Sequence, residues 1–541
     1  MPGMIVAPQP LAVEEGAKVL QAGGNAVDAA VTCALVQGIV SPQMCGVGGY
    51  LLLTLSQAGG VEPDPHAQAV ALDAPALAGS KVRPDMWADI ALRPNPGGWG
   101  YFVRGKVNDC GYGSICTPGT VKGLARMLER WGTLSWERAV EPAVRIAREG
   151  FVVDADLAGE WRWKAAFPEA CSSLEYIQRN AEASRIYLHP DGTPPEAGEM
   201  VRNPDYAQTL TELAARGPED FYRGALAARM SADLAQNGSF VTAADLAGYR
   251  LREPQPLVGT YRDWTIVTSP APHGGPTLLA MLNILEGYDL TRLGHNSPEY
   301  ILQMALAMKA AFADRNRLLG DPEFVDVPLE WMISKQRAAE WRQAIARGEE
   351  IHVSLVPSGS PDTTHVSVVD SQGMCVALTH SLGSSSGVIT PGLGFIYNNS
   401  MVNFCPWPGH PNSIAPGKSR TTGMAPTIVY RGGRPVLVIG APGATRIITS
   451  LVQVIVNHLD FGMRVSDAVL APRFDCQGDL IECQARIPEF VCAKVRERHP
   501  ISRLPRSHGG MALVHAISMD RASGALAGAA DTGSGGMALL V

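Results

Sequence analysis

Thr363 is a candidate nucleophile whose chemistry depends on a break in the backbone. The stretch SPDTTHVSVVD (residues 360–370) places Asp362 and Thr363 directly before an alternating apolar pattern. A threonine hydroxyl is a weak nucleophile at its normal pKa and needs an adjacent base. If the bond Asp362–Thr363 breaks, the new α-amine, whose pKa starts near ~8, supplies that base. The alternative is a polar turn that leads into a strand.

A second candidate is GSSSG (residues 383–387), which matches G-x-S-x-G and would make Ser385 a hydrolase nucleophile. That motif needs a strand, a sharp elbow and then a helix. The sequence VITPGLGF follows instead, with a proline and strand-forming residues. We therefore expect a flexible polar loop here.

A third candidate is GAPGATR (residues 440–446), which lies between the apolar run PVLVI and a helical pattern. Backbone N–H groups at such a junction can stabilise an oxyanion. The same residues also suit a tight strand-to-helix turn without chemistry, so both interpretations stay open at this point.

Composition excludes several classes of protein. The 541 residues are 46% hydrophobic and 18% charged, with a formal net charge of -7 and no long basic run. A globular core is therefore expected, and nucleic-acid binding is not favoured. The ten cysteines contain no C-x-x-C or zinc-ligand spacing, which favours reduced, buried thiols. Cys110 and Cys116 are close enough to pair, but free thiols are the preferred interpretation.

The start of the chain lacks the basic residues, apolar run and cleavage site of a signal peptide. The most apolar stretch, residues 26–40, is interrupted by Asp28 and Gln37, so it fits a buried helix better than a membrane span. We expect a cytoplasmic protein without a membrane partner.

The order of elements changes along the chain. Residues 10–40 predict a helix, a Gly-Gly turn and a second helix, and glycines precede a strand at residues 45–55. Residues 120–350 are mainly helical, with strand-like pieces such as residues 259–269. The border with the next part lies in the Pro/Ser/Gly-rich stretch at residues 352–364.

After the border the apolar period changes towards two. Strands are expected at residues 365–370 and 374–380, around a turn at Asp370–Gly373. Further strands or hairpins are expected at residues 395–404, 426–443 and 512–531, with a helix at residues 445–462. A sheet-rich part thus follows a helix-rich part.

Taken together, these segments resemble one family. The motifs GGNAVDAAV, GVGGY, TPGTVKGL, TTHVSVVD, NNSMVNF, PGKSRTTGMAPTIV, GAPGATRIIT and APRF occur in the order seen in γ-glutamyltransferases and related cephalosporin acylases. The resemblance covers nearly the whole chain. It implies an α+β fold, the four-layer αββα sandwich of N-terminal-nucleophile hydrolases. It also implies a precursor that cleaves itself before Thr363 into a large subunit (1–362) and a small subunit (363–541), which stay associated as one intertwined domain.

The resemblance also implies catalytic roles. Thr363 matches the family nucleophile, and Ser381 stands eighteen residues later, where the family usually has a second Thr that touches it. Gly443 and Ala444 match a Gly-Gly pair whose N–H groups form the oxyanion hole, and Ala444 keeps its N–H. No metal or organic cofactor is implied; the reaction needs an amide substrate and water or an amine acceptor.

The γ-glutamyl-binding residues of the family are only partly kept. The family binds the α-carboxylate with an Arg in R-E-x-A-P, and the matching stretch ALDAPALAG (residues 71–79) has none. Five further positions of the family's binding site differ: a Ser-Ser pair becomes Thr422 and Gly423, an acidic residue becomes Asn403, a Gln/Glu becomes Ser400, and an Asn becomes Gly383.

These changes remove charges that would bind a zwitterionic glutamyl group, and we expect the binding free energy of such a group to weaken by several kcal/mol. An acyl group without the α-amino group would lose less binding free energy. The acylase branch of the family likewise departs from the γ-glutamyl pocket, so the chain resembles that branch more at these positions. Arg420 or Arg446 could supply a replacement cation. Three functions remain open: an acylase-like amidohydrolase, a γ-glutamyltransferase with an altered pocket that cleaves glutathione-like compounds, and an unprocessed, non-catalytic binding protein.

Overall fold

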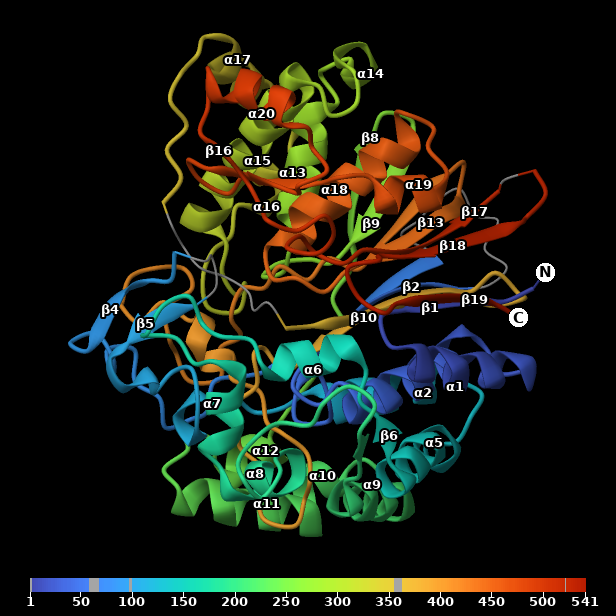
Figure 1. Cartoon of the computed structure of the whole chain (residues 1–541), viewed down its shortest axis with the longest axis vertical. Helices are drawn as coiled ribbons and strands as arrows, with labels where there is room; N and C mark the ends of the chain where they lie inside the picture. Colours follow the sequence, from blue (N-terminus) through green and yellow to red (C-terminus); the bar gives the residue numbers. More distant parts are fainter. Residues whose placement is uncertain (1, 58–67, 97–99, 355–361, 521) are drawn as a thin grey trace.

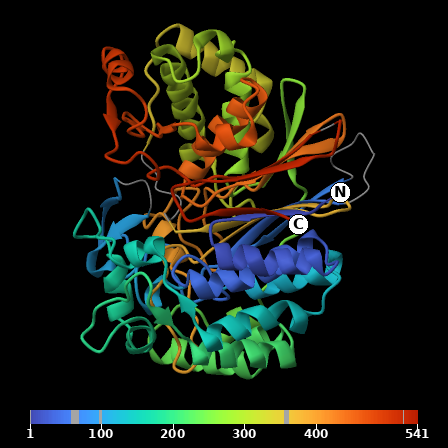
Figure 2. The ribbon, with the colours of Figure 1, turned by 45° about the vertical axis from the view of Figure 1, so that its right-hand side comes forward.

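Two stacked antiparallel sheets, each covered by helices on its outer side, form the centre of the molecule (Figures 1 and 2). The structure is a computed structural model and describes residues 2–57, 68–96, 100–354, 362–520 and 522–541. Most of the predicted border stretch, residues 355–361, lies outside the described residues. The order of layers is helix, sheet, sheet, helix, which confirms the expected αββα sandwich.

The first six-stranded sheet contains the hairpin that begins beside Thr363. Its strand order is β19-β1-β10-β11-β2-β3. The strands are β19 (Met537–Leu540), β1 (Met4–Ala7), β10 (Thr364–Val369), β11 (Cys375–Ser381), β2 (Tyr50–Ser56) and β3 (Ala69–Ala74). Strands that precede and strands that follow residue 362 are therefore hydrogen-bonded into one sheet.

The second six-stranded sheet has the same mixed origin. Its strand order is β18-β17-β13-β12-β9-β8. The strands are β18 (Leu526–Ala530), β17 (His515–Met519), β13 (Arg434–Gly440), β12 (Thr427–Arg431), β9 (Trp264–Thr268) and β8 (Leu257–Tyr261). The predicted hairpins at residues 426–443 and 512–531 are confirmed as β12–β13 and β17–β18.

Helices cover the outer faces of both sheets (Figure 1). On the first sheet lie α1 (Pro10–Gln21), α2 (Ala26–Val40) and α4 (Thr120–Trp131); α5 (Trp136–Glu149) packs on α2, and α9 (Pro204–Arg216) packs on α5. On the second lie α13 (Gly275–Leu285), α18 (Arg446–Leu459) and α19 (Val465–Leu470), and α15 (Pro298–Leu318) and α17 (Lys335–Ala346) pack on α13. Among the described residues, no helix combines the length and apolarity needed to cross a bilayer.

The two sheets pack face to face through a continuous apolar layer. The layer includes Val6 of β1, Val369 of β10, Ile428 of β12, Val438 of β13 and Ile517 of β17, all buried. Because β10 and β11 have a sheet on one face and helices on the other, every residue in both strands is buried. The ends of these strands are thereby held rigidly.

Two glycines before β2 allow the backbone to approach the hairpin closely. A Cβ on Gly48 would lie 2.2 Å from the Ile396 oxygen, and one on Gly49 would lie 2.3 Å from the Ser381 oxygen. These distances are shorter than any side chain tolerates, so the predicted role of the glycines in close approach is supported.

The predicted strand at residues 395–404 is wrong. The segment is irregular apart from a bridge between Tyr397 and Gly48, and it ends in a 3-10 turn at Ser400–Asn403. The reason is that side-chain hydrogen bonds take the place of the backbone hydrogen bonds between strands: Asn398 Nδ2 donates to the carbonyls of Gly48 and Cys116. Buried backbone groups are satisfied in this way without a strand.

Candidate active site

Thr363 lies immediately before β10, with its hydroxyl against the peptide bond that precedes it. Thr363 Oγ1 is 2.6 Å from the carbonyl oxygen of Asp362 and 3.2 Å from Ser381 Oγ. The side chain is 6% exposed. The nucleophilic oxygen, the scissile carbonyl and a second hydroxyl are thus in mutual contact in the uncut chain.

Ser381 is placed by the register of the β10–β11 hairpin. Thr364 pairs with His380, so Thr363 and Ser381 stand opposite each other at the open end. Ser381 Oγ accepts a hydrogen bond from Gly383 N at 2.9 Å and donates to the Asp362 carbonyl at 2.7 Å. The hydroxyl hydrogen is therefore directed at the oxygen on which negative charge develops during attack.

Gly443 lies beside the same threonine. Thr363, Pro442, Gly443 and residues from several other segments line a cavity of about 130 Å³. Gly443 and Ala444 occupy the turn between β13 and α18, with φ angles of 135° and 57°. A Cβ on Gly443 would lie 2.6 Å from Ala512 Cα, so glycine is required there. Two successive residues with positive φ present their backbone N–H groups in a turn, an arrangement that resembles the anion-binding sites known as nests.

The Thr422–Gly423 pair packs directly against this turn. A Cβ on Gly423 would lie 2.1 Å from the Ala444 carbonyl oxygen. Thr422 N donates to the Pro272 carbonyl at 3.2 Å. The candidate oxyanion turn and the candidate acyl-binding pair are therefore adjacent.

Gly383 follows the end of β11, and Ser400 and Asn403 lie in a later segment that is hydrogen-bonded to it through Asn399 N and the Leu382 carbonyl. Gly383 has φ 84°, and a Cβ there would lie 2.2 Å from Asn399 Oδ1. Ser400 and Asn403 are fully buried at the two ends of the 3-10 turn that follows Asn399. Neither residue is among those that line the cavity beside Thr363, and neither side chain carries a negative charge.

Two carboxyl groups that interact with Asp362, those of Asp109 and Glu160, were not found from the sequence. Burial raises the pKa of Asp362 to about 7, and Asp109 adds to the shift. Burial also raises the pKa of Glu160 well above its usual range, with Asp362, Asp154 and Asp156 adding to it. These acids come from remote segments without a shared motif, so no spacing pattern could have indicated them.

The histidine of the T-T-H motif is not a base for Thr363. Burial lowers the pKa of His365 well below its usual range. Its two ring nitrogens contact Thr379 Oγ1 at 2.8 Å and Ser367 Oγ at 3.0 Å. A neutral, fully engaged imidazole leaves proton transfer to other groups.

The two arginines considered as replacement cations differ in their partners. Arg446 pairs with Glu482 and lies 3.6 Å from Asp475. Arg420 is buried, contacts Tyr50 and, within the described ranges, has no carboxylate at ion-pair distance. Only Arg420 therefore keeps an uncompensated charge.

Ser385 does not form a nucleophile elbow, and its loop differs from the flexible one expected. The residue has φ 65°, as an elbow would, but no helix follows it. Ser384, Ser385 and Ser386 are buried. Ser384 N donates to Asn399 Oδ1 at 2.8 Å, which fixes the loop against the segment that contains Ser400 and Asn403.

The preferred interpretation of Cys110 and Cys116 as free thiols is confirmed, and both are buried. Cys110 Sγ lies 2.8 Å from Sγ of another free, buried thiol, Cys171. The adjacent Asp109 accepts hydrogen bonds from the Asn399 amide with its carbonyl oxygen at 3.0 Å and its carboxylate at 3.2 Å. The cysteine pair is thus linked through one residue to the segment that contains Ser400 and Asn403.

Comparisons with known proteins agree with this geometry. The model of the gamma-glutamyltranspeptidase family matches residues 12–541. The acylase ACY 1 proenzyme of Pseudomonas sp. (strain V22) is 38% identical over 98% of this chain and 91% of its own length. The glutathione hydrolase proenzyme of Escherichia coli (strain K12) is 32% identical over 88% of this chain and 81% of its own.

A solved structure shows the same fold. The crystal structure of cephalosporin acylase from Bacillus halodurans superposes with a TM-score of 0.85 and 26% identity, covering 99% of this chain and 95% of that one. The family match and the sequence identity extend over nearly the whole chain. The protein therefore belongs to the gamma-glutamyltranspeptidase family of hydrolases and acyltransferases with an N-terminal nucleophile.

Proposed function

We propose that the chain cleaves itself between Asp362 and Thr363 and then acts as an amidohydrolase on an acyl group that lacks a free α-amino group. The single observation that carries the proposal is the contact among Thr363 Oγ1, Ser381 Oγ and the Asp362 carbonyl oxygen. A nucleophile, an electrophile and an oxyanion donor are adjacent before any cleavage.

Self-cleavage would proceed by an N-to-O acyl shift. Thr363 Oγ1 attacks the Asp362 carbonyl carbon while the Ser381 hydroxyl stabilises the developing oxyanion. The C–N bond breaks, the amine takes up a proton, and Asp362 is held as an ester on Thr363. Water then hydrolyses the ester, which releases the Asp362 carboxylate and leaves the free α-amine of Thr363.

Turnover would use the same oxygen. The Thr363 amine accepts the hydroxyl proton as Oγ1 attacks the substrate carbonyl, and the N–H groups of Gly443 and Ala444 stabilise the oxyanion. The leaving amine takes the proton as the C–N bond breaks, and an acyl-enzyme remains. Water, or an acceptor amine, then releases the acyl group. The products of self-cleavage, 1–362 and 363–541, would stay joined because both sheets contain strands of each.

The choice of acyl group rests on the residues at the two positions where the family resemblance implies recognition of an ammonium group. Asn403 and Ser400 are neutral, and no carboxylate stands at these positions to bind an ammonium group. The 38% identity to the acylase proenzyme favours the same interpretation. A glutathione-hydrolase activity is the second candidate, favoured by the 32% identity to the Escherichia coli glutathione hydrolase proenzyme.

The test has two stages. The denatured mass of freshly purified protein should give two fragments, the smaller beginning at Thr363, and an intact chain that is stable for days would overturn the proposal. Paired amides with and without the α-amino group then separate the two candidates. A strong preference for the γ-glutamyl member would replace the acylase assignment by the second candidate.

A further inference from the structure

A buried arginine that the proposed mechanism does not use lies behind the turn at residues 442–444, which we call the oxyanion turn. Arg473 belongs to the APRF motif and is 2% exposed. Its guanidinium donates to the carbonyl oxygens of Val469 and Ala512, the latter at 3.1 Å, and pairs with the buried carboxylate of Asp531. Burying a guanidinium is costly unless it is paired and hydrogen-bonded, so these contacts hold the three segments together.

One of the three contacts reaches the oxyanion turn through a single residue. Ala512 packs on Gly443, because a Cβ on Gly443 would lie 2.6 Å from both Cα and Cβ of Ala512. The next residue, Leu513, donates its N–H to the Pro442 carbonyl at 3.0 Å. This bond continues the ladder between β13 and β17 up to the turn. Arg473 therefore holds the segment against which Gly443 is packed.

Asp531, the ion-pair partner of Arg473, holds a second segment beside the same cavity. Asp531 Oδ1 accepts from Gly533 N at 2.8 Å, and Asp531 N donates to the Val514 carbonyl at 3.0 Å. The residues that line the cavity with Thr363 include Met511, Leu513, Ser534 and Gly535. The Arg473–Asp531 pair thus joins two segments that border the nucleophile.

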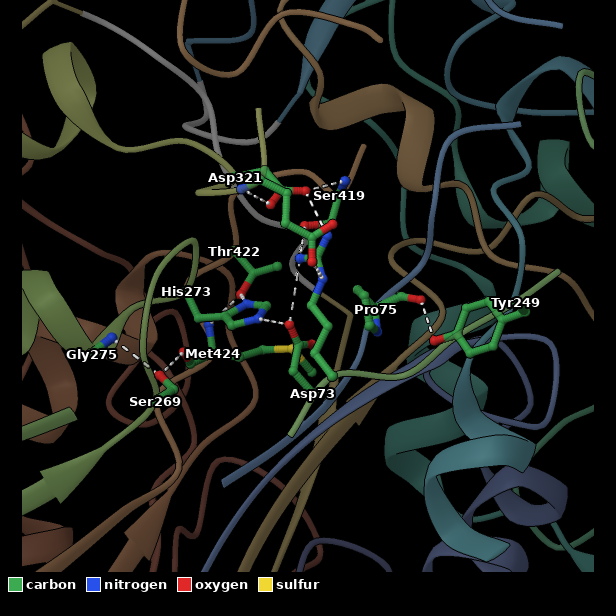
Figure 3. Close-up of polar contacts among 12 residues, drawn as sticks. Asp73, Pro75, Tyr249, Ser269, His273, Gly275, Asp321, Ser419, Thr422 and Met424 are labelled. Atoms are coloured by element: carbon green, nitrogen blue, oxygen red, sulfur yellow. Dashed lines mark hydrogen bonds and ion pairs between the residues drawn. The ribbon is translucent and has the colours of Figure 1, made fainter. Parts of the chain in front are cut away.

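The other side of the oxyanion turn is held without Arg473. Ala444 packs on Gly423, and both ends of the surrounding segment Ser419–Met424 are fixed by hydrogen bonds that Figure 3 shows. Its first residue donates its N–H to Asp321 Oδ2 at 2.8 Å, and the carbonyl of its last residue accepts from a serine hydroxyl at 3.1 Å. A change at Arg473 should therefore alter the spacing of the two N–H groups of the turn, not the position of the whole turn.

The spacing of these N–H groups matters because both must reach the same oxygen. Donors stabilise an oxyanion most when they are fixed in advance at about 2.7–3.1 Å from it. A displacement on the order of 1 Å near the reacting atoms can lower the rate about a hundredfold. Gly443 has φ 135° and no side chain of its own to fix it, so its packing on Ala512 decides where its N–H points.

We propose that Arg473, paired with Asp531, positions the oxyanion turn for turnover by fixing residues 511–513 behind Gly443. Arg473 is a positioning residue: it contacts the backbone behind the turn and does not touch the reacting atoms. The inference rests on the proposed function, in which turnover uses the N–H groups of the turn and self-cleavage uses the Ser381 hydroxyl. Arg473 therefore serves turnover and not self-cleavage.

The test compares Arg473→Lys with wild type in these two reactions of the same chain. Lysine keeps a positive charge for Asp531, but it lacks the planar fork that reaches two carbonyls and a carboxylate at once. Self-cleavage, followed by denaturing mass spectrometry of newly synthesised protein, should stay close to the wild-type rate. Turnover is measured on fully cleaved protein with γ-glutamyl p-nitroanilide and its des-amino analogue. For the faster substrate, kcat should fall about tenfold to a hundredfold while KM changes little.

Arg337→Lys is the matched control. Arg337 of α17 forms a bidentate pair with the buried Asp314 of α15, with N–O distances of 2.8 and 2.9 Å, and neither residue lines the cavity. The variant should lower the melting temperature without changing kcat or the rate of self-cleavage. Loss of a buried arginine–aspartate pair is thereby separated from displacement of the oxyanion turn.

Ala512→Gly covers the case in which Arg473→Lys does not fold. It removes the methyl group that lies against Gly443 and leaves the ion pair in place, and it should lower kcat several-fold with self-cleavage unchanged. Equal slowing of both reactions would show that these residues support the fold and not the turn, which overturns the inference. If the cleaved wild type hydrolyses an amide and the variants match its kcat, the inference alone is wrong. If the cleaved wild type hydrolyses neither amide, the proposed function fails and the inference fails with it.

Discussion

Replacing Ser381 by alanine should slow self-cleavage sharply. The Ser381 hydroxyl donates to the Asp362 carbonyl at 2.7 Å, and its oxygen is fixed by Gly383 N at 2.9 Å. Loss of one oriented donor to a developing oxyanion costs about 2.7–4 kcal/mol, or about 10²–10³ in rate. The variant also leaves the buried Gly383 N–H without this partner, which costs about 1–3 kcal/mol of stability.

The assay is a time course of the two fragments, measured by denaturing mass spectrometry on newly synthesised protein at constant pH and temperature. Ser381→Thr is the control because it keeps the hydroxyl at the same backbone position, and we expect its rate within about tenfold of wild type. Thermal unfolding of precursors arrested by Thr363→Ala, with and without Ser381→Ala, separates loss of fold from loss of catalysis. A Ser381→Ala precursor that matures at nearly the wild-type rate would refute the role of this hydroxyl.

Three other results are expected. Burial raises the pKa of Asp362 to about 7, so the folded precursor binds more protons than the unfolded chain between pH ~4 and ~7 and its stability falls as pH rises through that range. In a precursor arrested by Thr363→Ala, the further change Asp362→Asn should reduce this fall in melting temperature. An unchanged dependence of melting temperature on pH would contradict the prediction. Asn403→Asp places a carboxylate at position 403 and should raise kcat/KM for a γ-glutamyl amide relative to its des-amino analogue by about tenfold. An unchanged ratio would show that residue 403 does not bind the substrate ammonium group. Cys110 and Cys171, with sulfurs 2.8 Å apart, should form a disulfide when the folded protein is treated with oxidised glutathione, and non-reducing peptide mapping that finds both thiols free would refute this.

The hairpin at the centre of the site could be predicted almost completely from the sequence. Alternation and the turn at Asp370–Gly373 define β10 and β11, and their register places Ser381 opposite Thr363. The glycines at 48 and 49 likewise indicated a close approach of two backbones. Such features are local, so they leave a periodic signal in the chain.

The rest of the site depends on contacts between remote segments. The predicted strand at residues 395–404 failed because Asn398 replaces ladder hydrogen bonds with side-chain ones. Glu160 and Asp109 lie in segments far from Thr363 in sequence, and burial raises the pKa of both. The contact between the free thiols of Cys110 and Cys171 joins residues 61 positions apart. No local pattern contains that information.

The neighbouring strands β19 and β1, at one edge of the first sheet, have a consequence for design by circular permutation. Gly3 and Val541 exchange backbone hydrogen bonds of 2.8 and 2.9 Å, and β1 and β19 run antiparallel from that point. A hairpin loop of about two to five residues could therefore join residue 541 to residue 3. A permuted gene that begins at Thr363 and ends at Asp362 would encode the nucleophile as a true first residue once the initiator methionine is removed. Turnover could then be measured in a protein that never needed to cut itself.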